Sequence, residues 1–121
     1  MKSQAYHMAM LFDFYGEVLT ERQKEFYDLY YNEDLSLGEI AENSGITRQG
    51  VRDVIVRAEA TLSDLEDKTG LISRFHTMQT QLALVEEAAG KLLSLNNKYN
   101  DPELEQLAQS IKATAQVLQK E

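Results

Sequence analysis

The segment that most constrains the fold is residues 36–58, SLGEIAENSGITRQGVRDVIVRA. Ser36 and Glu39 have the spacing of an N-terminal capping box, and Thr47 has the position of a second helix cap. Between them lies Gly45, and glycine readily adopts the positive φ that a sharp inter-helix turn requires. The apolar positions of the two helices recur at helical spacing and are Leu37, Ile40, Ala41, Val51, Val54, Ile55 and Ala58. The segment therefore predicts a helix-turn-helix.

The second helix of this motif is the candidate for nucleic-acid binding. Arg48, Gln49 and Arg52 lie outside its apolar stripe, and we expect them nearest to the base edges of duplex DNA. Thr47 and Arg57 are expected to contact phosphates. A helical corner that serves only packing is the alternative interpretation of the same spacing.

Gly50 lies three residues into this second helix, where glycine costs about 1 kcal/mol relative to alanine. Its missing Cβ permits either close approach to a groove or partner, or a tight packing contact within the protein. The sequence alone leaves both explanations open.

The charge distribution limits how DNA could be bound. The chain has 121 residues and a net charge of −8, and residues 1–45 contain three Lys or Arg against nine Asp or Glu. Residues 46–58 contain three Arg against one Asp, so the basic character is confined to the predicted recognition helix. Three arginines engage few phosphates, and a monomer would bind weakly at physiological salt, whereas a dimer doubles that number. The acidic remainder suits a basic protein partner, and an interaction adaptor is therefore the second hypothesis.

Two resemblances extend this interpretation. Glu39-Ile40-Ala41, Gly45 to Arg48 and Val51-Arg52 resemble the helix-turn-helix of sigma factor region four, and Leu19 to Gln23 resembles the helix before it. Over nearly the whole chain, the sequence is similar to the YlxM family, as seen in LFDFYG at residues 11–16, Leu19-Thr20 and Tyr30-Tyr31. That resemblance implies a DNA-binding protein associated with the signal recognition particle pathway, with the particle's protein or RNA as a further partner.

A different periodicity follows Gly70. Apolar residues then alternate at spacings of four and three, which is the pattern of a coiled-coil seam. This seam consists of Leu71, Phe75, Met78, Leu82, Val85, Ala89, Leu92 and Asn96, and a second face consists of Ile72, Leu84, Ala88, Leu93 and Leu95. We expect one face to pack on a returning helix that starts at Pro102, and the other to form a homodimer through Leu71, Phe75, Met78, Leu82, Val85 and Leu92. A monomer whose long helix packs on its own N-terminal half is the alternative.

The predicted fold is therefore all-α, with a sigma factor region four-like helix-turn-helix domain over residues 1–69 and a long helical hairpin over residues 70–121. Tyr6, Tyr15, Tyr27, Tyr30, Tyr31 and the four phenylalanines lie at helical spacing beside Leu and Met, without interleaved basic residues. We therefore expect these aromatic side chains to form packing contacts rather than platforms for single-stranded bases.

Several functions have no support in the sequence. The chain contains no cysteine, and neither His7 nor His76 has a neighbouring carboxylate at helical spacing, so we expect no metal and no cofactor. No phosphate-binding loop or nucleophile motif is present, and we expect neither catalysis nor a small-molecule substrate. The longest apolar run, Met8–Phe12, is far shorter than the ~20 residues that cross a bilayer. These features favour a cytoplasmic protein without membrane insertion.

Overall fold

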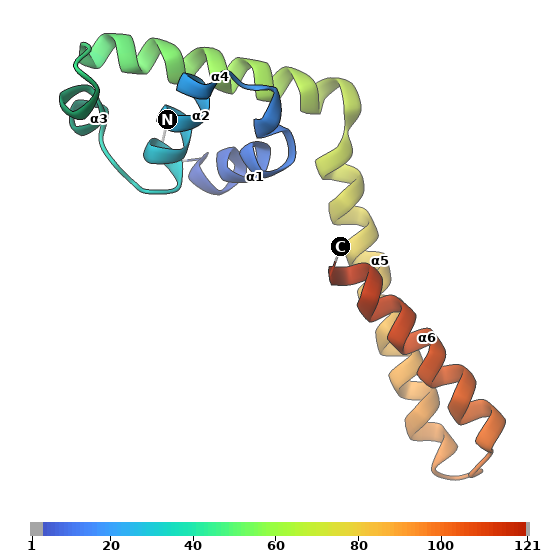
Figure 1. The fold of residues 1–121 in the computed structure, drawn as a ribbon. Helices are drawn as coiled ribbons and strands as arrows, with labels where there is room; N and C mark the ends of the chain where they lie inside the picture. Colours follow the sequence, from blue (N-terminus) through green and yellow to red (C-terminus); the bar gives the residue numbers. More distant parts are fainter. Residues whose placement is uncertain (1–3, 121) are drawn as a thin grey trace. The chain divides into compact units, whose positions relative to one another are not determined.

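The computed structural model describes residues 4–120, and within this range it contains helices and no strands (Figure 1). The all-α prediction is confirmed. The elements are α1 (Ala5–Tyr15), the single 3₁₀ turn η2 (Gly16–Val18), α2 (Glu21–Tyr31), α3 (Leu37–Ser44), α4 (Arg48–Thr69), α5 (Leu71–Asn96) and α6 (Pro102–Lys120).

The chain forms two compact units, residues 1–72 and residues 73–121. The predicted boundary lay at residues 69 and 70. The difference arises because Ile72, in the first turn of α5, is 6% exposed and belongs to the core of the first unit. The sequence pattern had placed Ile72 on the second face of the hairpin instead.

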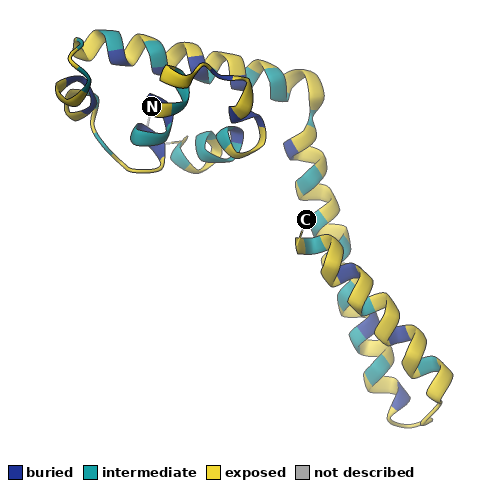
Figure 2. Ribbon diagram, viewed as in Figure 1, coloured by how far each residue is buried: buried dark blue, intermediate teal, exposed yellow. Residues whose placement is uncertain are grey.

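The core of the first unit is built from α1 to α4 and the start of α5 (Figure 2). Its fully buried large side chains are Leu11, Phe26, Tyr27, Ile40, Val51, Ile55 and Leu62. Phe12 stacks on Tyr27 at a centroid distance of 5.2 Å, and Tyr27 lies 4.8 Å from Tyr31. The aromatic residues of α2 are therefore packing residues, as predicted. Among the other aromatic residues of this prediction, Tyr6 and Phe14 of α1 are 74% and 37% exposed.

A polar cluster surrounds the C-terminal end of α4, which is followed by Gly70 with a φ of +62°. The Tyr15 hydroxyl donates to Glu66 Oε1 at 2.6 Å and lies 2.7 Å from Thr69 Oγ1. The same Glu66 oxygen accepts a hydrogen bond from the backbone N–H of Ile72 at 3.0 Å. Burial, and then the hydrogen bond to Glu66, raise the pKa of Tyr15, so the hydroxyl remains a donor at neutral pH.

In the second unit, α6 returns antiparallel to α5 (Figure 1). The positions of α5 that are buried or half-buried in this unit are Phe75, Gln79, Leu82, Glu86, Ala89, Gly90, Leu93 and Asn96. They share Phe75, Leu82, Ala89 and Asn96 with the predicted seam, whereas Leu71, Met78, Val85 and Leu92 are exposed. At every second position the observed seam therefore differs from the predicted one. Gln79, Glu86 and Leu93 take the places predicted for Met78, Val85 and Leu92.

Hydrogen bonds explain how polar side chains enter this seam. Gln79 Nε2 donates to the backbone carbonyl of Gln119 at 3.1 Å, and Gln116 Nε2 donates to Glu86 Oε1 at 3.0 Å. Buried polar groups are tolerated where such partners satisfy them. An apolar pattern alone cannot reveal these positions, because each partner lies 30 or more residues away along the chain.

The hairpin is closed by a reciprocal pair of hydrogen bonds. Asn96 Nδ2 donates to the carbonyl of Asp101, and the Asp101 N–H donates to Asn96 Oδ1, both at 2.9 Å. Asp101 Oδ1 also accepts from the N–H of Glu103 at 2.9 Å, so it caps α6. Pro102 follows as the first helical residue, as predicted.

Candidate nucleic-acid interface

The helix-turn-helix predicted from residues 36–58 consists of α3, its turn and the first half of α4. Ser36 Oγ accepts from the Glu39 N–H, and the Glu39 carboxylate accepts from the Ser36 N–H, both at 3.1 Å. This is the predicted capping box. Gly45 has a φ of +71°, which confirms the reason for glycine in the turn. Thr47 Oγ1 then accepts from the Gly50 N–H at 2.9 Å and caps α4.

Packing fixes which side of α4 faces outward. Val51, Ile55, Ala58 and Leu62 are fully buried in the core. On the same helix, Glu59 Oε1 accepts a hydrogen bond from the Tyr31 hydroxyl at 2.7 Å, which ties α4 to α2. Burial, followed by this hydrogen bond, raises the pKa of Tyr31, so the tie persists at neutral pH. These contacts fix which side of α4 faces the core and which side faces solvent.

All five predicted contact residues are exposed. They are Thr47, Arg48, Gln49, Arg52 and Arg57. Arg48, Gln49 and Arg52 lie within the first two turns of α4, which places them together near its N-terminus. Within the described residues, no ion pair involves the three arginines, so their guanidinium groups are available to a ligand.

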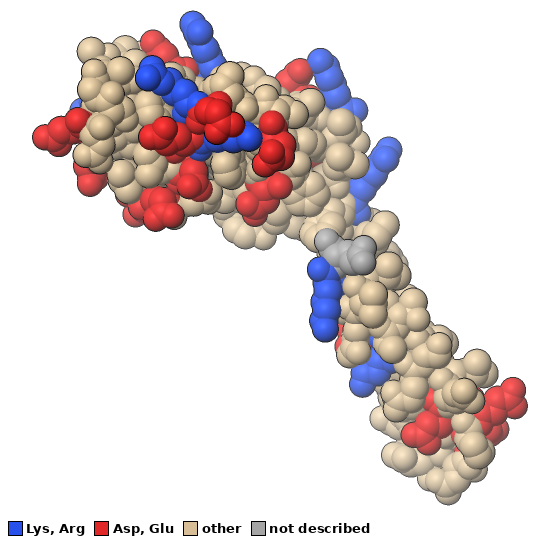
Figure 3. Space-filling view, viewed as in Figure 1, with Lys and Arg blue, Asp and Glu red and all other residues tan. Residues whose placement is uncertain are grey.

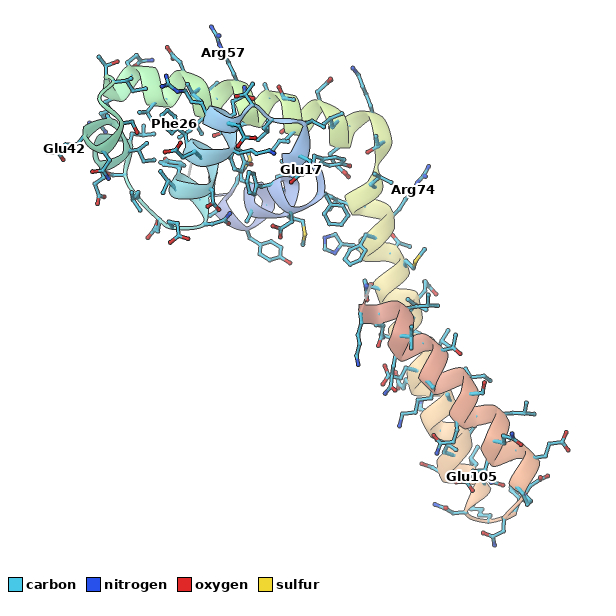
Figure 4. The ribbon with its side chains drawn as sticks, viewed as in Figure 1. Glu17, Phe26, Glu42, Arg57, Arg74 and Glu105 are labelled. Atoms are coloured by element: carbon cyan, nitrogen blue, oxygen red, sulfur yellow. The ribbon has the colours of Figure 1, made fainter. Side chains whose placement is uncertain are left out.

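Arg57 lies apart from these residues. It projects away from the body of the first unit (Figure 4). At about 100° per residue, its direction differs by roughly 140° from that of Arg52. A helix seated in a groove has a phosphate strand on each side, so this separation is compatible with a backbone contact for Arg57 and base contacts for the others.

Two further residues on the outward side were not assigned a role from the sequence. Asp53 accepts a hydrogen bond from Gln49 Nε2 at 2.9 Å, so the predicted base-reading amide is held by its own helix. Val56 is 37% exposed one turn beyond Arg52. Their positions, four residues after Gln49 and Arg52, are the signal in the sequence that could have identified them. A valine methyl group can contact the methyl group of thymine.

The surroundings of Gly50 favour a packing explanation for its missing side chain. A Cβ at this position would lie 3.1 Å from Thr47 Oγ1 and 3.5 Å from Ile46 Cδ1. The first distance is shorter than an ordinary van der Waals contact. The added Cβ would therefore crowd Thr47 Oγ1, the oxygen that caps α4. The tight contact therefore lies within the turn.

Acidic side chains gather over the visible face of the first unit (Figure 3). Lys24 partly offsets them, since its Nζ lies 3.5 Å from Glu17 Oε2 and 3.7 Å from Glu21 Oε1. Both carboxylates are almost fully solvent-exposed, so these ion pairs contribute little to stability.

Metal-binding clusters and membrane-spanning helices are both absent from the part of the chain that the structure describes. Among residues 4–120, no three His, Cys, Asp or Glu side chains come together in a group that could hold a metal ion. No helix in the same range combines the length and the apolar character that crossing a bilayer requires.

Comparison with known proteins places this chain in a family. Residues 2–114 match the UPF0122 family, described as "Putative helix-turn-helix protein, YlxM / p13 like". The chain belongs to this family. The resemblance to YlxM proteins is thereby confirmed, and the family description agrees with the observed α3–turn–α4 arrangement.

Individual family members match over most of their length. A UPF0122 protein of Bacillus mycoides is 40% identical over 111 residues, which cover 92% of this chain and 96% of that protein. One from Thermoanaerobacter sp. (strain X514) is 38% identical over 104 residues, or 86% of each chain. One from Desulforamulus reducens is 56% identical over 77 residues, or 64% of each chain. The first two of these matches are longer than the 72 residues of the first unit, so the similarity extends beyond the helix-turn-helix.

Proposed function

We propose that this protein binds duplex DNA by placing the N-terminal half of α4 in the major groove. The observation that carries the proposal is the exposed group of Arg48, Gln49 and Arg52 on the second helix of a helix-turn-helix. Arginine donates two hydrogen bonds to guanine, and glutamine donates one hydrogen bond to adenine and accepts another from it. The buried side of α4 fixes the direction of these side chains. In this proposal the protein acts in the cytoplasm by binding DNA. It catalyses no reaction and needs no cofactor or small-molecule substrate.

The N-terminus of α4 supplies the phosphate contacts in this arrangement. The Thr47 oxygen accepts from the Gly50 N–H, which leaves its hydroxyl hydrogen free to donate to a phosphate. The first backbone N–H groups of a helix also favour an anion. Arg57 adds a cation on another side of α4.

A comparison of the two helix caps tests this assignment. Thr47→Ala and Ser36→Ala each remove a cap, and each is expected to lower the free energy of unfolding by about 1 kcal/mol in a urea titration. Only Thr47→Ala is expected to weaken duplex binding as well, by roughly threefold to tenfold in fluorescence anisotropy, because Ser36 caps the helix that does not enter the groove. Equal affinities for the two variants would remove Thr47 from the interface.

The acidic surface supports a second candidate function. Residues 1–45 carry a net charge of −6, from three Lys or Arg and nine Asp or Glu. Exposed carboxylates such as Glu17 and Glu21 suit a basic protein better than bare nucleic acid. With the pathway implied by the YlxM resemblance, this surface supports an adaptor that contacts the protein component of the signal recognition particle. The resemblance alone adds the particle's RNA as a partner and regulation of its components as a role.

The two candidates differ in the expected partner. If the protein is an adaptor, it co-purifies with the particle's GTPase and RNA at low salt, and charge-neutralising substitutions at Glu17 and Glu21 release it. If neither component is retained at low salt, the adaptor candidate fails, while duplex binding through α4 is measured separately.

A further inference from the structure

The α5–α6 hairpin has two unlike faces. On one face, Gln116 Nε2 donates to Glu86 Oε1, and Glu87 forms an ion pair with Lys91 at 3.4 Å on the adjoining side of α5. The other face carries six large apolar side chains, each between 38% and 59% exposed. They are Met78, Val85 and Leu92 from α5, and Leu107, Ile111 and Leu118 from α6.

This apolar face has the periodicity of a second helical seam. On α5 the exposed residues Met78, Gln81, Val85, Ala88, Leu92 and Leu95 follow one another at spacings of three and four. On α6 the exposed residues Leu107, Ile111, Thr114 and Leu118 do the same. Such spacing keeps one side of a helix in continuous contact with a partner helix. Neither row contains a charged residue.

A groove joins the two rows. It has a volume of about 270 Å³, and its lining is mainly apolar: Leu82 and Val85 from α5, and Ser110, Ile111, Thr114, Ala115 and Leu118 from α6. Val85 is the midpoint of Met78 and Leu92, and Ile111 lies near the midpoint of the α6 row. A two-fold axis through this groove would therefore bring each row against an equivalent row.

We propose that this face, defined by Met78, Val85, Leu92, Leu107, Ile111 and Leu118, packs against the same face of a second copy to form a four-helix bundle. Specific complexes bury at least about 1,200 Å² in total, and here each copy would contribute six large apolar side chains that are between 38% and 59% exposed. A contact without charged residues also suits two chains that each carry a net charge of −8 and would repel through charged faces.

The residues involved differ from those of the predicted dimer seam. Met78, Val85 and Leu92 remain available, whereas Phe75 and Leu82 are half-buried within one chain and Leu71 lies outside the second unit. The α6 residues replace them. The proposal does not depend on DNA binding, and its tests are made without DNA.

Sedimentation equilibrium of the full chain tests the assembly. The natural protein is expected to have twice its chain mass of 13.8 kDa at micromolar concentration. Val85→Glu places a charge at the centre of the face and is expected to raise the dimer dissociation constant at least a hundredfold. Thr80→Glu is the matched control, because Thr80 is exposed on a different side of α5, and it should leave the dimer intact.

Disulfide trapping tests the same contact without a disruptive charge. The chain has no cysteine, so Val85→Cys introduces a single thiol, and near a two-fold axis this thiol meets its own copy. Oxidation is expected to cross-link Val85→Cys at micromolar concentration and to leave Thr80→Cys uncross-linked. A monomeric natural protein, or equal cross-linking of the two variants, would overturn the proposal.

Discussion

Arg52→Ala is expected to weaken duplex binding about tenfold, equivalent to ~1.4 kcal/mol, because a paired contact from arginine to guanine is lost. Arg52 is exposed on α4, is directed outward by the buried Val51 and Ile55, and forms no ion pair within the described residues. Its replacement therefore removes a ligand contact without removing an internal one. The measurement is fluorescence anisotropy on a labelled duplex across a salt series.

The salt dependence separates the roles of the arginines. If Arg52 contacts a base, Arg52→Ala lowers affinity with little change in the slope of log K against log salt. Arg57→Ala, which removes a proposed phosphate contact, is expected to reduce that slope by about 1. Arg74→Ala is the matched control, since Arg74 is an exposed arginine on α5 (Figure 4). Equal losses for Arg52→Ala and Arg74→Ala would mean that α4 is not the binding helix.

Ile55→Ala is expected to lower the free energy of unfolding by about 2–5 kcal/mol, a large part of the ~5–15 kcal/mol typical of a domain. Ile55 is 0% exposed on the buried side of α4, so removing its side chain leaves a cavity in the core of the first unit. Urea unfolding measured by circular dichroism gives the change directly.

The adjacent Val56 provides the control for this substitution. It is 37% exposed, and Val56→Ala should change the free energy of unfolding by less than about 0.5 kcal/mol. The two variants differ in which side of α4 loses methyl groups. If Val56→Ala destabilises the protein as much as Ile55→Ala, the orientation of α4 is wrong, and so is the assignment of its outward side chains.

The parts of the fold that sequence predicted correctly depend on local chemistry. Ser36, Gly45 and Thr47 act on backbone groups within three or four residues, so their roles are visible in the sequence itself. The burial of Val51 and Ile55 follows from helical spacing for the same reason.

The parts that were missed depend on distant partners or on polar pairs. The hairpin seam contains Gln79 and Glu86, whose hydrogen-bond partners lie 40 and 30 residues away along the chain. Hydrophobic spacing instead predicted the neighbouring apolar residues Met78 and Val85 at these positions. Within the candidate interface, the pair Gln49–Asp53 was not predicted, because apolar spacing carries no information about hydrogen bonds between exposed side chains. The outward direction of Arg48 and Arg52 was predictable from helical spacing, whereas the four-residue spacing of Gln49 and Asp53 was the only sign of the restraint on Gln49.

The central claim is that α4 forms the contact with duplex DNA. The most direct test follows the backbone amide resonances of the isotope-labelled full chain during titration with a duplex at low salt. We expect the largest shift changes between Thr47 and Arg57, with small changes in α2 and α6. Shift changes concentrated on α2, or no salt-sensitive change in α4, would contradict binding through α4.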